Sequence, residues 1–170
     1  DGTSLLETFF SDIAGYGKTT IVVGTGNEGA GGGHTSATAV LGQEEEAEFV
    51  IAPYETGLSV QLWKNYADIF TITLITPQGE SSGPIDSQLG PQTIRYKGTR
   101  VLLYYGKPSP YSQSQEIYLD FLPVGDYLDS GIWRLRLTPR RVVAGDYDLW
   151  MPSAGLLNPS TRFLYANPDT

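Results

Sequence analysis

Trp133-Arg134-Leu135-Arg136-Leu137-Thr138 is the stretch that decides the fold. Large apolar side chains occupy every second position, and charged or hydroxyl side chains occupy the positions between them. A period of two is typical of a strand that buries one face and leaves the other in solvent. This stretch therefore predicts one strand of an antiparallel sheet that covers a hydrophobic core.

The same alternation recurs along most of the chain, for example where Ile117, Leu119 and Phe121 alternate with Tyr118 and Asp120. The chain contains 20 Gly and 11 Pro, and only 18% of its residues are charged, which favours many turns over long surface helices. The sequence thus predicts a mainly β protein, a jelly-roll-like antiparallel β-sandwich. Its candidate strands are residues 47–52, 57–63, 68–76, 92–96, 99–105, 117–121, 133–137 and 146–151.

The first thirty residues follow a different pattern. Ser4 and Glu7 form a capping box before an apolar stripe at helical spacing, and Gly15 and Gly17 can end that helix. Ile21-Val22-Val23 then resembles a strand buried on both faces of a parallel α/β sheet. One helix and one strand cannot form a domain, so we expect them to belong to a sheet formed elsewhere. The stripe consists of Leu5, Leu6, Phe9, Phe10 and Ile13.

These patterns divide the chain into four segments. Residues 1–30 are predicted as a helix and strand remnant of an α/β domain, residues 31–43 as a linker, residues 44–158 as an inserted β-sandwich, and residues 159–170 as a return linker. The chain begins at Asp1 without an initiator methionine or a signal sequence, and we expect it to be a piece of a larger protein. An inserted domain needs its two ends close together, so residues 40 and 160 should not lie at opposite poles.

The composition restricts the ligands that we expect. The net charge is -8 and the sequence pI is about 4.5, which disfavours nucleic acid and membrane surfaces; Arg134 and Arg136 are expected to form a solvated face. The chain has no cysteine, which excludes disulfides and thiolate-bound metals. We expect no cofactor and no metal, because the acidic run Glu44-Glu45-Glu46 points in several directions, although calcium bound by oxygen ligands stays open.

A glycine-rich loop, Gly24-Thr25-Gly26-Asn27-Glu28-Gly29, follows the candidate strand and matches the dinucleotide-binding pattern G-x-G-x-x-G. That pattern requires a helix directly after the loop, and residues 30–36 are a poor helix start. The glycines could also serve only to let the chain turn tightly as it leaves a buried strand.

The segment from Ile21 to Gly29 resembles the part of subtilisin-like serine proteases, the subtilases, in which a buried strand leads into Asn-Glu-Gly. Gly29 to Ser36 and Asn158 to Phe163 resemble the start and end of a jelly-roll insertion in subtilases of anaerobic Gram-positive bacteria, including the clostridial germination proteases. The resemblance implies that Asn27 is the oxyanion-hole asparagine, a donor worth about 3 to 4 kcal/mol in subtilisin. It also implies that Gly24, Thr25 and Gly26 line the substrate pocket.

The catalytic triad of a serine protease is not recognisable in this sequence. His34 is the only histidine, and its setting resembles a loop or packing residue rather than a triad base. Ser4 is explained as the helix cap, and the aspartates from Asp146 to Asp148 have no expected histidine partner. The chain is therefore predicted to be inactive alone, while its parent would be a serine endopeptidase.

These inferences define two candidate functions. In the first, the chain is a non-catalytic fragment of an exported bacterial subtilase, secreted or associated with the cell envelope or spore. The sandwich then has a structural, regulatory or substrate-access role, and the partners are the rest of the catalytic domain and, through it, a peptide substrate. An exposed Ile21–Val23 strand could also pair with a second copy of the chain.

In the second, the sandwich is an autonomous carbohydrate- or protein-binding module. Many flat aromatic side chains motivate this alternative, although such rings more often fill a core or brace loops. They are Trp63, Tyr66, Tyr104, Tyr105, Tyr111, Tyr118 and Trp150.

Overall fold

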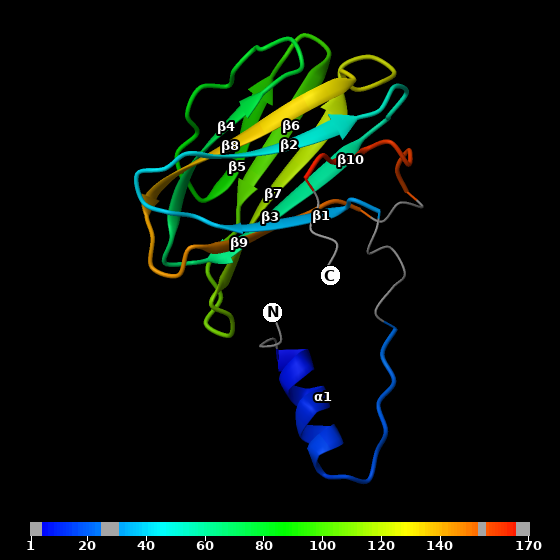
Figure 1. Ribbon diagram of the computed structural model, residues 1–170, viewed down its shortest axis with the longest axis vertical. Coiled ribbons are helices and arrows are strands. Elements are labelled where there is room, and N and C mark those ends of the chain that lie inside the picture. Colours follow the sequence, from blue (N-terminus) through cyan, green and yellow to red (C-terminus); the bar gives the residue numbers. More distant parts are fainter. Residues whose placement is uncertain (1–4, 25–30, 153–155, 166–170) are drawn as a thin grey trace.

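A computed structural model describes residues 5–24, 31–152 and 156–165. Within these residues, ten strands form two antiparallel sheets that face each other, which confirms the predicted β-sandwich (Figure 1). All eight predicted strands are present. The six-stranded sheet has the order β1 (His34–Thr38), β9 (Asp146–Trp150), β3 (Leu58–Asn65), β7 (Ser114–Pro123), β6 (Thr99–Tyr105) and β5 (Gly90–Arg95); the four-stranded sheet has the order β10 (Arg162–Phe163), β2 (Glu45–Ile51), β8 (Gly131–Arg141) and β4 (Ile69–Ile75).

Most consecutive strands cross between the two sheets, except that β5, β6 and β7 follow one another in the six-stranded sheet. β1, β3, β7 and β9 lie in the six-stranded sheet, whereas β2, β4, β8 and β10 lie in the four-stranded sheet. This alternation is the connectivity of a jelly-roll-like sandwich, and β5 and β6 extend one sheet beyond it. As a consequence, β9 lies between β1 and β3, so that segments distant in sequence share one sheet face.

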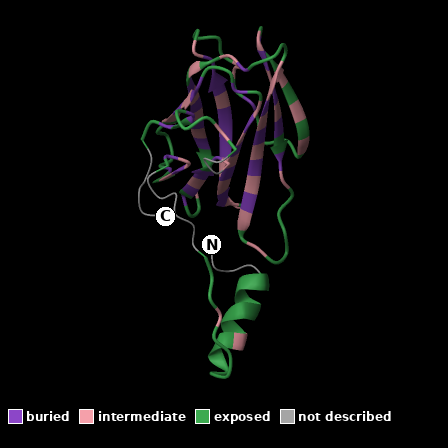
Figure 2. Ribbon diagram, turned by 90° about the vertical axis from the view of Figure 1, so that its right-hand side faces the viewer, coloured by how far each residue is buried: buried purple, intermediate pink, exposed green. Residues whose placement is uncertain are grey.

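The core forms where the apolar faces of the two sheets meet, and burial alternates along most of the strands, whereas β4 is buried at nearly every position (Figure 2). Trp133 on β8 is fully buried and packs edge-on against Phe121 of the facing sheet, with ring centroids 5.4 Å apart. Its indole N–H donates to the carbonyl oxygen of Asp129 at 2.9 Å. The strand around Trp133 therefore buries one face in the core, as its alternation predicts.

Two stretches that the sequence predicts as linkers each contribute a strand. β1 lies within residues 31–43 and pairs with β9, and β10 lies within residues 159–170 and pairs with β2. The sandwich thus extends beyond residues 44–158. Both strands are short and lie at sheet edges, where backbone hydrogen bonds to one neighbour hold the strand without an alternating apolar face.

The N-terminal segment matches its prediction in part. The helix is present as α1 (Leu5–Gly15) and lies apart from the sandwich (Figures 1 and 2); Ser4, its expected cap, lies outside the described residues. Ile21 to Val23 do not form a strand, and Val22 is 90% exposed. The predicted strand has no sheet to pair with in the described part of the chain, and an isolated strand leaves its backbone groups unpaired.

Among the described residues, no helix has the length and apolar character needed to cross a membrane.

Candidate functional sites on the sandwich

The chain enters and leaves the sandwich at one place, the junction, formed by residues 31–33 and 158–163. Phe163 N–H donates to the carbonyl oxygen of Gly32 at 2.8 Å, and Met151 N–H donates to that of Gly33 at 2.8 Å. The two ends of the sandwich are therefore adjacent. Residue 40, which the sequence predicts to lie near residue 160, lies instead at the end of β1 away from the junction, where Ala39 N–H donates to the carbonyl oxygen of Gly145. That expectation is wrong for residue 40, and the adjacent ends are residues 32 and 163.

Glycine is required at position 32 of the junction. The φ angle of Gly32 is +70°, and a Cβ added there would lie 3.0 Å from the Cβ of Arg162. Both the backbone conformation and the close approach of the outgoing segment disfavour any larger residue. Part of the glycine-rich run 31–33 is therefore explained by the contact between the incoming and outgoing segments.

Glu55 fixes the outgoing segment and was not anticipated from the sequence. Its side chain is buried, and Oε1 accepts hydrogen bonds from the backbone N–H of Asn158 at 2.7 Å and from the hydroxyl of Thr161. Thr161 Oγ1 in turn accepts from the backbone N–H of Ala52 at 3.0 Å. One carboxylate thus ties the loop before β3 to the residues that precede β10.

The residues implied by the subtilase resemblance lie mostly outside the described part of the chain. Thr25, Gly26 and Asn27 belong to this group, whereas Gly24 is described and is exposed. No described strand precedes this loop, and the chain continues from Gly31 to Gly33 into β1 rather than into a helix. The surroundings that a dinucleotide site requires are therefore missing from the described residues.

His34 has an acidic partner, contrary to the expectation from sequence. Its Nε2 lies 3.0 Å from Oδ1 of Asp148, and its ring stacks on Trp150 with centroids 3.8 Å apart. The pairing was missed because β1 was not predicted, and only β1 places residue 34 beside residue 148. His34 is 6% exposed beneath the indole, so it packs and orients its neighbours rather than presenting a base to a substrate.

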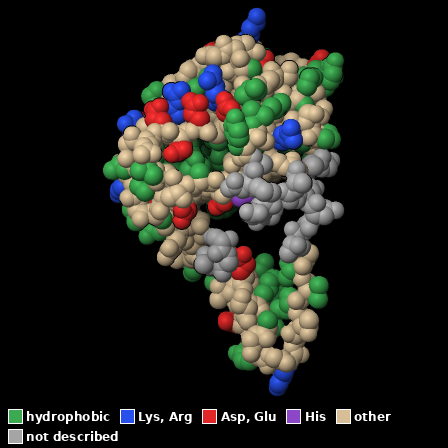
Figure 3. Space-filling model, in the orientation of Figure 1, with side chains coloured by type: hydrophobic (Ala, Val, Ile, Leu, Met, Phe, Trp, Pro, Cys, Tyr) green, Lys and Arg blue, Asp and Glu red, His purple; other side chains and the backbone are tan. Residues whose placement is uncertain are grey.

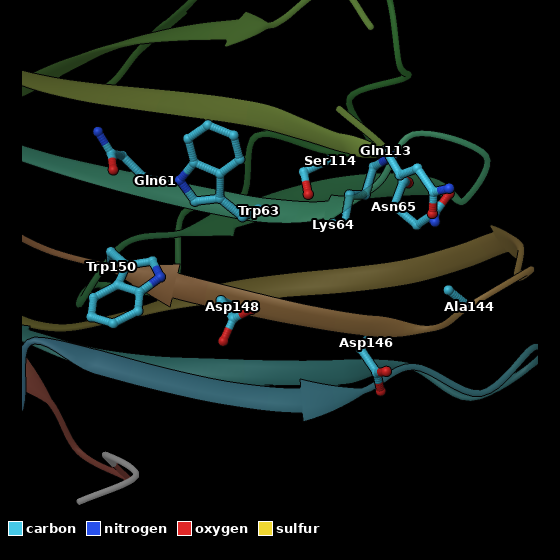
Figure 4. Close-up of a pocket in the computed structure, with 10 residues that line it drawn as sticks. All are labelled: Gln61, Trp63, Lys64, Asn65, Gln113, Ser114, Ala144, Asp146, Asp148 and Trp150. Atoms are coloured by element: carbon cyan, nitrogen blue, oxygen red, sulfur yellow. The ribbon is translucent and has the colours of Figure 1, made fainter. Parts of the chain in front are cut away.

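An open groove of about 740 Å³ lies on the outer face of the six-stranded sheet. Figure 4 shows Trp63 of β3 and Trp150 of the neighbouring β9, with Asp148 beside Trp150 on β9 and across from Trp63. Amide and hydroxyl side chains complete the lining. The lining residues are Gln61, Trp63, Lys64, Asn65, Gln113, Ser114, Ala144, Asp146, Asp148 and Trp150.

No family model and no curated protein sequence matches the chain. A solved structure, that of the Clostridium perfringens CspB protease, matches it with a TM-score of 0.83 and 29% sequence identity over 98% of this chain. The chain spans 34% of the CspB chain, about a third of the protein that it matches. This similarity supports a relationship to subtilisin-like proteases.

Beneath the groove, the buried ammonium group of Lys64 is held by a network of hydrogen bonds. Lys64 is 4% exposed, and its Nζ donates to the carbonyl oxygen of Asp68 at 2.6 Å and to Oε1 of Gln115 at 2.7 Å. Burial lowers the pKa of Lys64 from 10.5 to about 8, and the charge of Asp68 opposes this shift. The carboxylate of Asp68 accepts from the backbone N–H groups of residues 143–145, which closes the loop between β8 and β9.

The outer face of the four-stranded sheet carries both acidic and basic side chains. On β8, Nη2 of Arg136 lies 2.7 Å from Oε1 of Glu46, and its Nε lies 3.7 Å from Oε2 of Glu44. Figure 3 shows acidic and basic side chains side by side where Figure 1 draws β2 and β8. Hydrogen bonds to Glu46 raise the pKa of Arg136. Within the described residues, no group of three or more His, Asp or Glu side chains is placed to hold a metal ion.

Proposed function

We propose that this chain is a non-catalytic segment of an exported subtilisin-like serine endopeptidase, in which a β-sandwich interrupts the catalytic domain. The observation that carries the proposal is the junction. Gly32 and Phe163 are joined by a hydrogen bond of 2.8 Å, so a domain could continue across the two ends of the sandwich with little distortion. Such adjacency of ends is what insertion into another domain requires.

The N-terminal segment supports the same proposal. Leu5, Leu6 and Phe9 of α1 are 57–67% exposed, and Val22 and Val23 are exposed as well. Apolar side chains on one helix and one extended segment are expected to be covered by a neighbouring layer. The remainder of the catalytic domain is the partner that we propose for this surface, and the similarity to the CspB protease is consistent with it.

Within such a protease, Asn27 would donate its side-chain amide to the oxyanion of the acyl-transfer intermediate, and Gly24 to Gly26 would line the substrate pocket. In the longer protease, Asn27→Ala is expected to lower kcat by about a hundredfold or more and to leave KM nearly unchanged. Gln88→Ala, at an exposed position of the sandwich outside the groove, is the control and should leave kcat unaffected. An unchanged kcat for Asn27→Ala would contradict the oxyanion assignment.

The junction itself provides the test of the insertion. In the longer protease, residues 33–162 can be replaced by a Gly-Ser linker of roughly three residues, since each residue spans about 3.8 Å. The shortened protein is expected to fold with its catalytic domain intact. Failure of every linker of this length to give a folded protein would contradict an inserted, separable sandwich.

The same replacement distinguishes the roles open to the sandwich. A structural role predicts a lower melting temperature with similar hydrolysis of small peptide substrates. A substrate-access role predicts an unchanged melting temperature and an altered ratio of kcat/KM between protein and peptide substrates. The isolated chain, which lacks a recognisable triad, is expected to hydrolyse neither.

A further inference from the structure

We propose that the groove on the outer face of the six-stranded sheet binds a neutral oligosaccharide, with Trp63 and Trp150 as stacking surfaces. The proposal rests on the groove alone and does not depend on the relationship to proteases. Flat aromatic faces beside a few fixed polar groups are the usual composition of a small-ligand site. The aromatic face covers the C–H face of a sugar ring, and amides and carboxylates bind its hydroxyl groups.

Trp150 is held in a fixed orientation. One face of its indole stacks on His34 at a centroid distance of 3.8 Å and an interplanar angle of 25°, while 38% of the residue stays exposed. His34 is buried and is fixed by Asp148 at 3.0 Å. A ring oriented before binding loses little conformational entropy when a ligand stacks on it, which favours affinity.

Trp63 adds a second aromatic surface from the neighbouring strand. It lies opposite Asp148, and Trp150 lies opposite Gln61, so the two tryptophans are diagonal neighbours on adjacent strands. Both side chains border the same groove in Figure 4. The carboxylate of Asp148, opposite Trp63 and next to Trp150 on the same face of β9, is thus placed beside both stacking surfaces.

The sheet register extends the site beyond the groove. Gln61 lies opposite Trp150 on one side and opposite Tyr118 on the other, and Tyr118 lies opposite Tyr104. The rings of Tyr104 and Tyr118 are 6.5 Å apart. From β9 to β6 this row crosses three strand spacings of about 4.8 Å, about 14 Å in all, which suits a short oligosaccharide rather than a single sugar.

The charges of the groove favour a neutral ligand over an anion. Lys64 is the cation among the described lining residues, but it is buried and donates to Asp68 and Gln115. Asp146 accepts a hydrogen bond from Thr38 at 2.7 Å, and Asp148 is paired with His34. Both carboxylates are already partnered, so they are better placed to accept from hydroxyl groups than to form a dedicated site for a cation.

The test is a titration of the 170-residue chain with neutral oligomers of glucose, N-acetylglucosamine, mannose and xylose, followed by tryptophan fluorescence and calorimetry. We expect at least one series to bind with an affinity that rises with oligomer length and is insensitive to salt. Hexalysine and dextran sulfate serve as cationic and anionic probes. Binding of hexalysine alone, weakened by salt, would overturn the proposal in favour of a basic peptide.

Variants locate the site. Trp150→Ala and Trp63→Ala should each weaken oligosaccharide binding about tenfold or more, and Trp150→Tyr, which keeps a stacking ring, should lose much less. Tyr127→Ala is the control, because Tyr127 is an exposed aromatic residue that packs on Tyr54 outside the groove. No binding of any neutral oligomer at millimolar concentration, or equal binding by folded Trp150→Ala, would overturn the proposal.

Discussion

The helix α1 and the strand β8 are both rich in apolar side chains, yet they end in opposite environments. Phe9 of α1 is 57% exposed, whereas Trp133 of β8 is fully buried. The difference is not in the segments but in what faces them: β8 has a second sheet opposite, whereas in the described part of the chain no layer packs against α1. The apolar face of an amphipathic element is buried only when a second element covers it, and among the described residues this happens in the sandwich and not at α1.

The largest difference in stability between changes in β8 and in α1 is expected for the core. Trp133→Ala removes a buried indole between the sheets and should lower the free energy of unfolding by about 3 to 5 kcal/mol. Phe9→Ala, the matched change in α1, should alter it by less than about 0.5 kcal/mol. Urea unfolding followed by fluorescence of the remaining tryptophans measures both variants. Similar losses for the two would show that α1 packs on the sandwich in solution.

A smaller effect is expected at the junction, which binds the outgoing segment to the sandwich. Glu55→Ala leaves the Asn158 N–H and the Thr161 hydroxyl without their buried acceptor and should cost about 1 to 3 kcal/mol. Hydrogen exchange at residues 158–163 should quicken in this variant. Glu80→Ala, at an exposed position, should change neither quantity, and unchanged protection in Glu55→Ala would contradict the role given to this carboxylate.

The buried Lys64 predicts a pH dependence specific to the sandwich. Its pKa falls from 10.5 to about 8 on burial, so between these values the unfolded chain binds a proton that the folded chain does not. Stability should therefore rise from pH 8 towards pH 10, by about 1 to 2 kcal/mol after allowance for solvent screening. Lys64→Met should abolish this slope in urea unfolding, even though it lowers the stability itself; a slope that persists would contradict the assignment.

Above pH 10 the slope of stability against pH reverses its sign. Burial raises the pKa of Tyr96 and Tyr147 from 10.0 to about 12, and raises that of Tyr105 as well. The hydroxyls of Tyr96 and Tyr105 donate to the carbonyl oxygens of Leu74 and Phe70. The folded chain retains these protons where the unfolded chain releases them, so stability should fall as the pH rises from 10 towards 12.

The smallest effect on stability is expected from the N-terminal segment. Deleting residues 1–24 should shift the melting temperature of the sandwich by no more than about 1 °C, because none of the residues that the structure describes buries the apolar side chains of α1. The deletion should instead abolish any self-association, which we attribute to the unpaired Ile21–Val23 segment. Sedimentation of the full chain, its Val22→Lys variant and the deletion measures this. Equal association of all three would contradict that attribution.

Sequence reasoning recovered the sandwich more completely than its sites. The eight predicted strands carry alternating or continuous apolar residues that are visible locally, whereas β1 and β10 are held by backbone pairing with distant strands. The sequence presents Trp63 and Trp150 only as two of several aromatic residues that could form a binding surface. Which of them share a groove depends on the register of β3 and β9 and on no local pattern.

The sequence by itself determined which face of each main strand is apolar, as in Trp133, Leu135 and Leu137, since a period of two fixes the side of the sheet on which a residue lies. Only the tertiary structure decided which strands are neighbours. His34 and Asp148, separated by 114 positions, meet because β1 pairs with β9. Gly32, just before the edge strand β1, meets Phe163 of the edge strand β10 through a backbone hydrogen bond. Pairing between strands depends on chain crossings and shared backbone hydrogen bonds, which no side-chain pattern within one segment records.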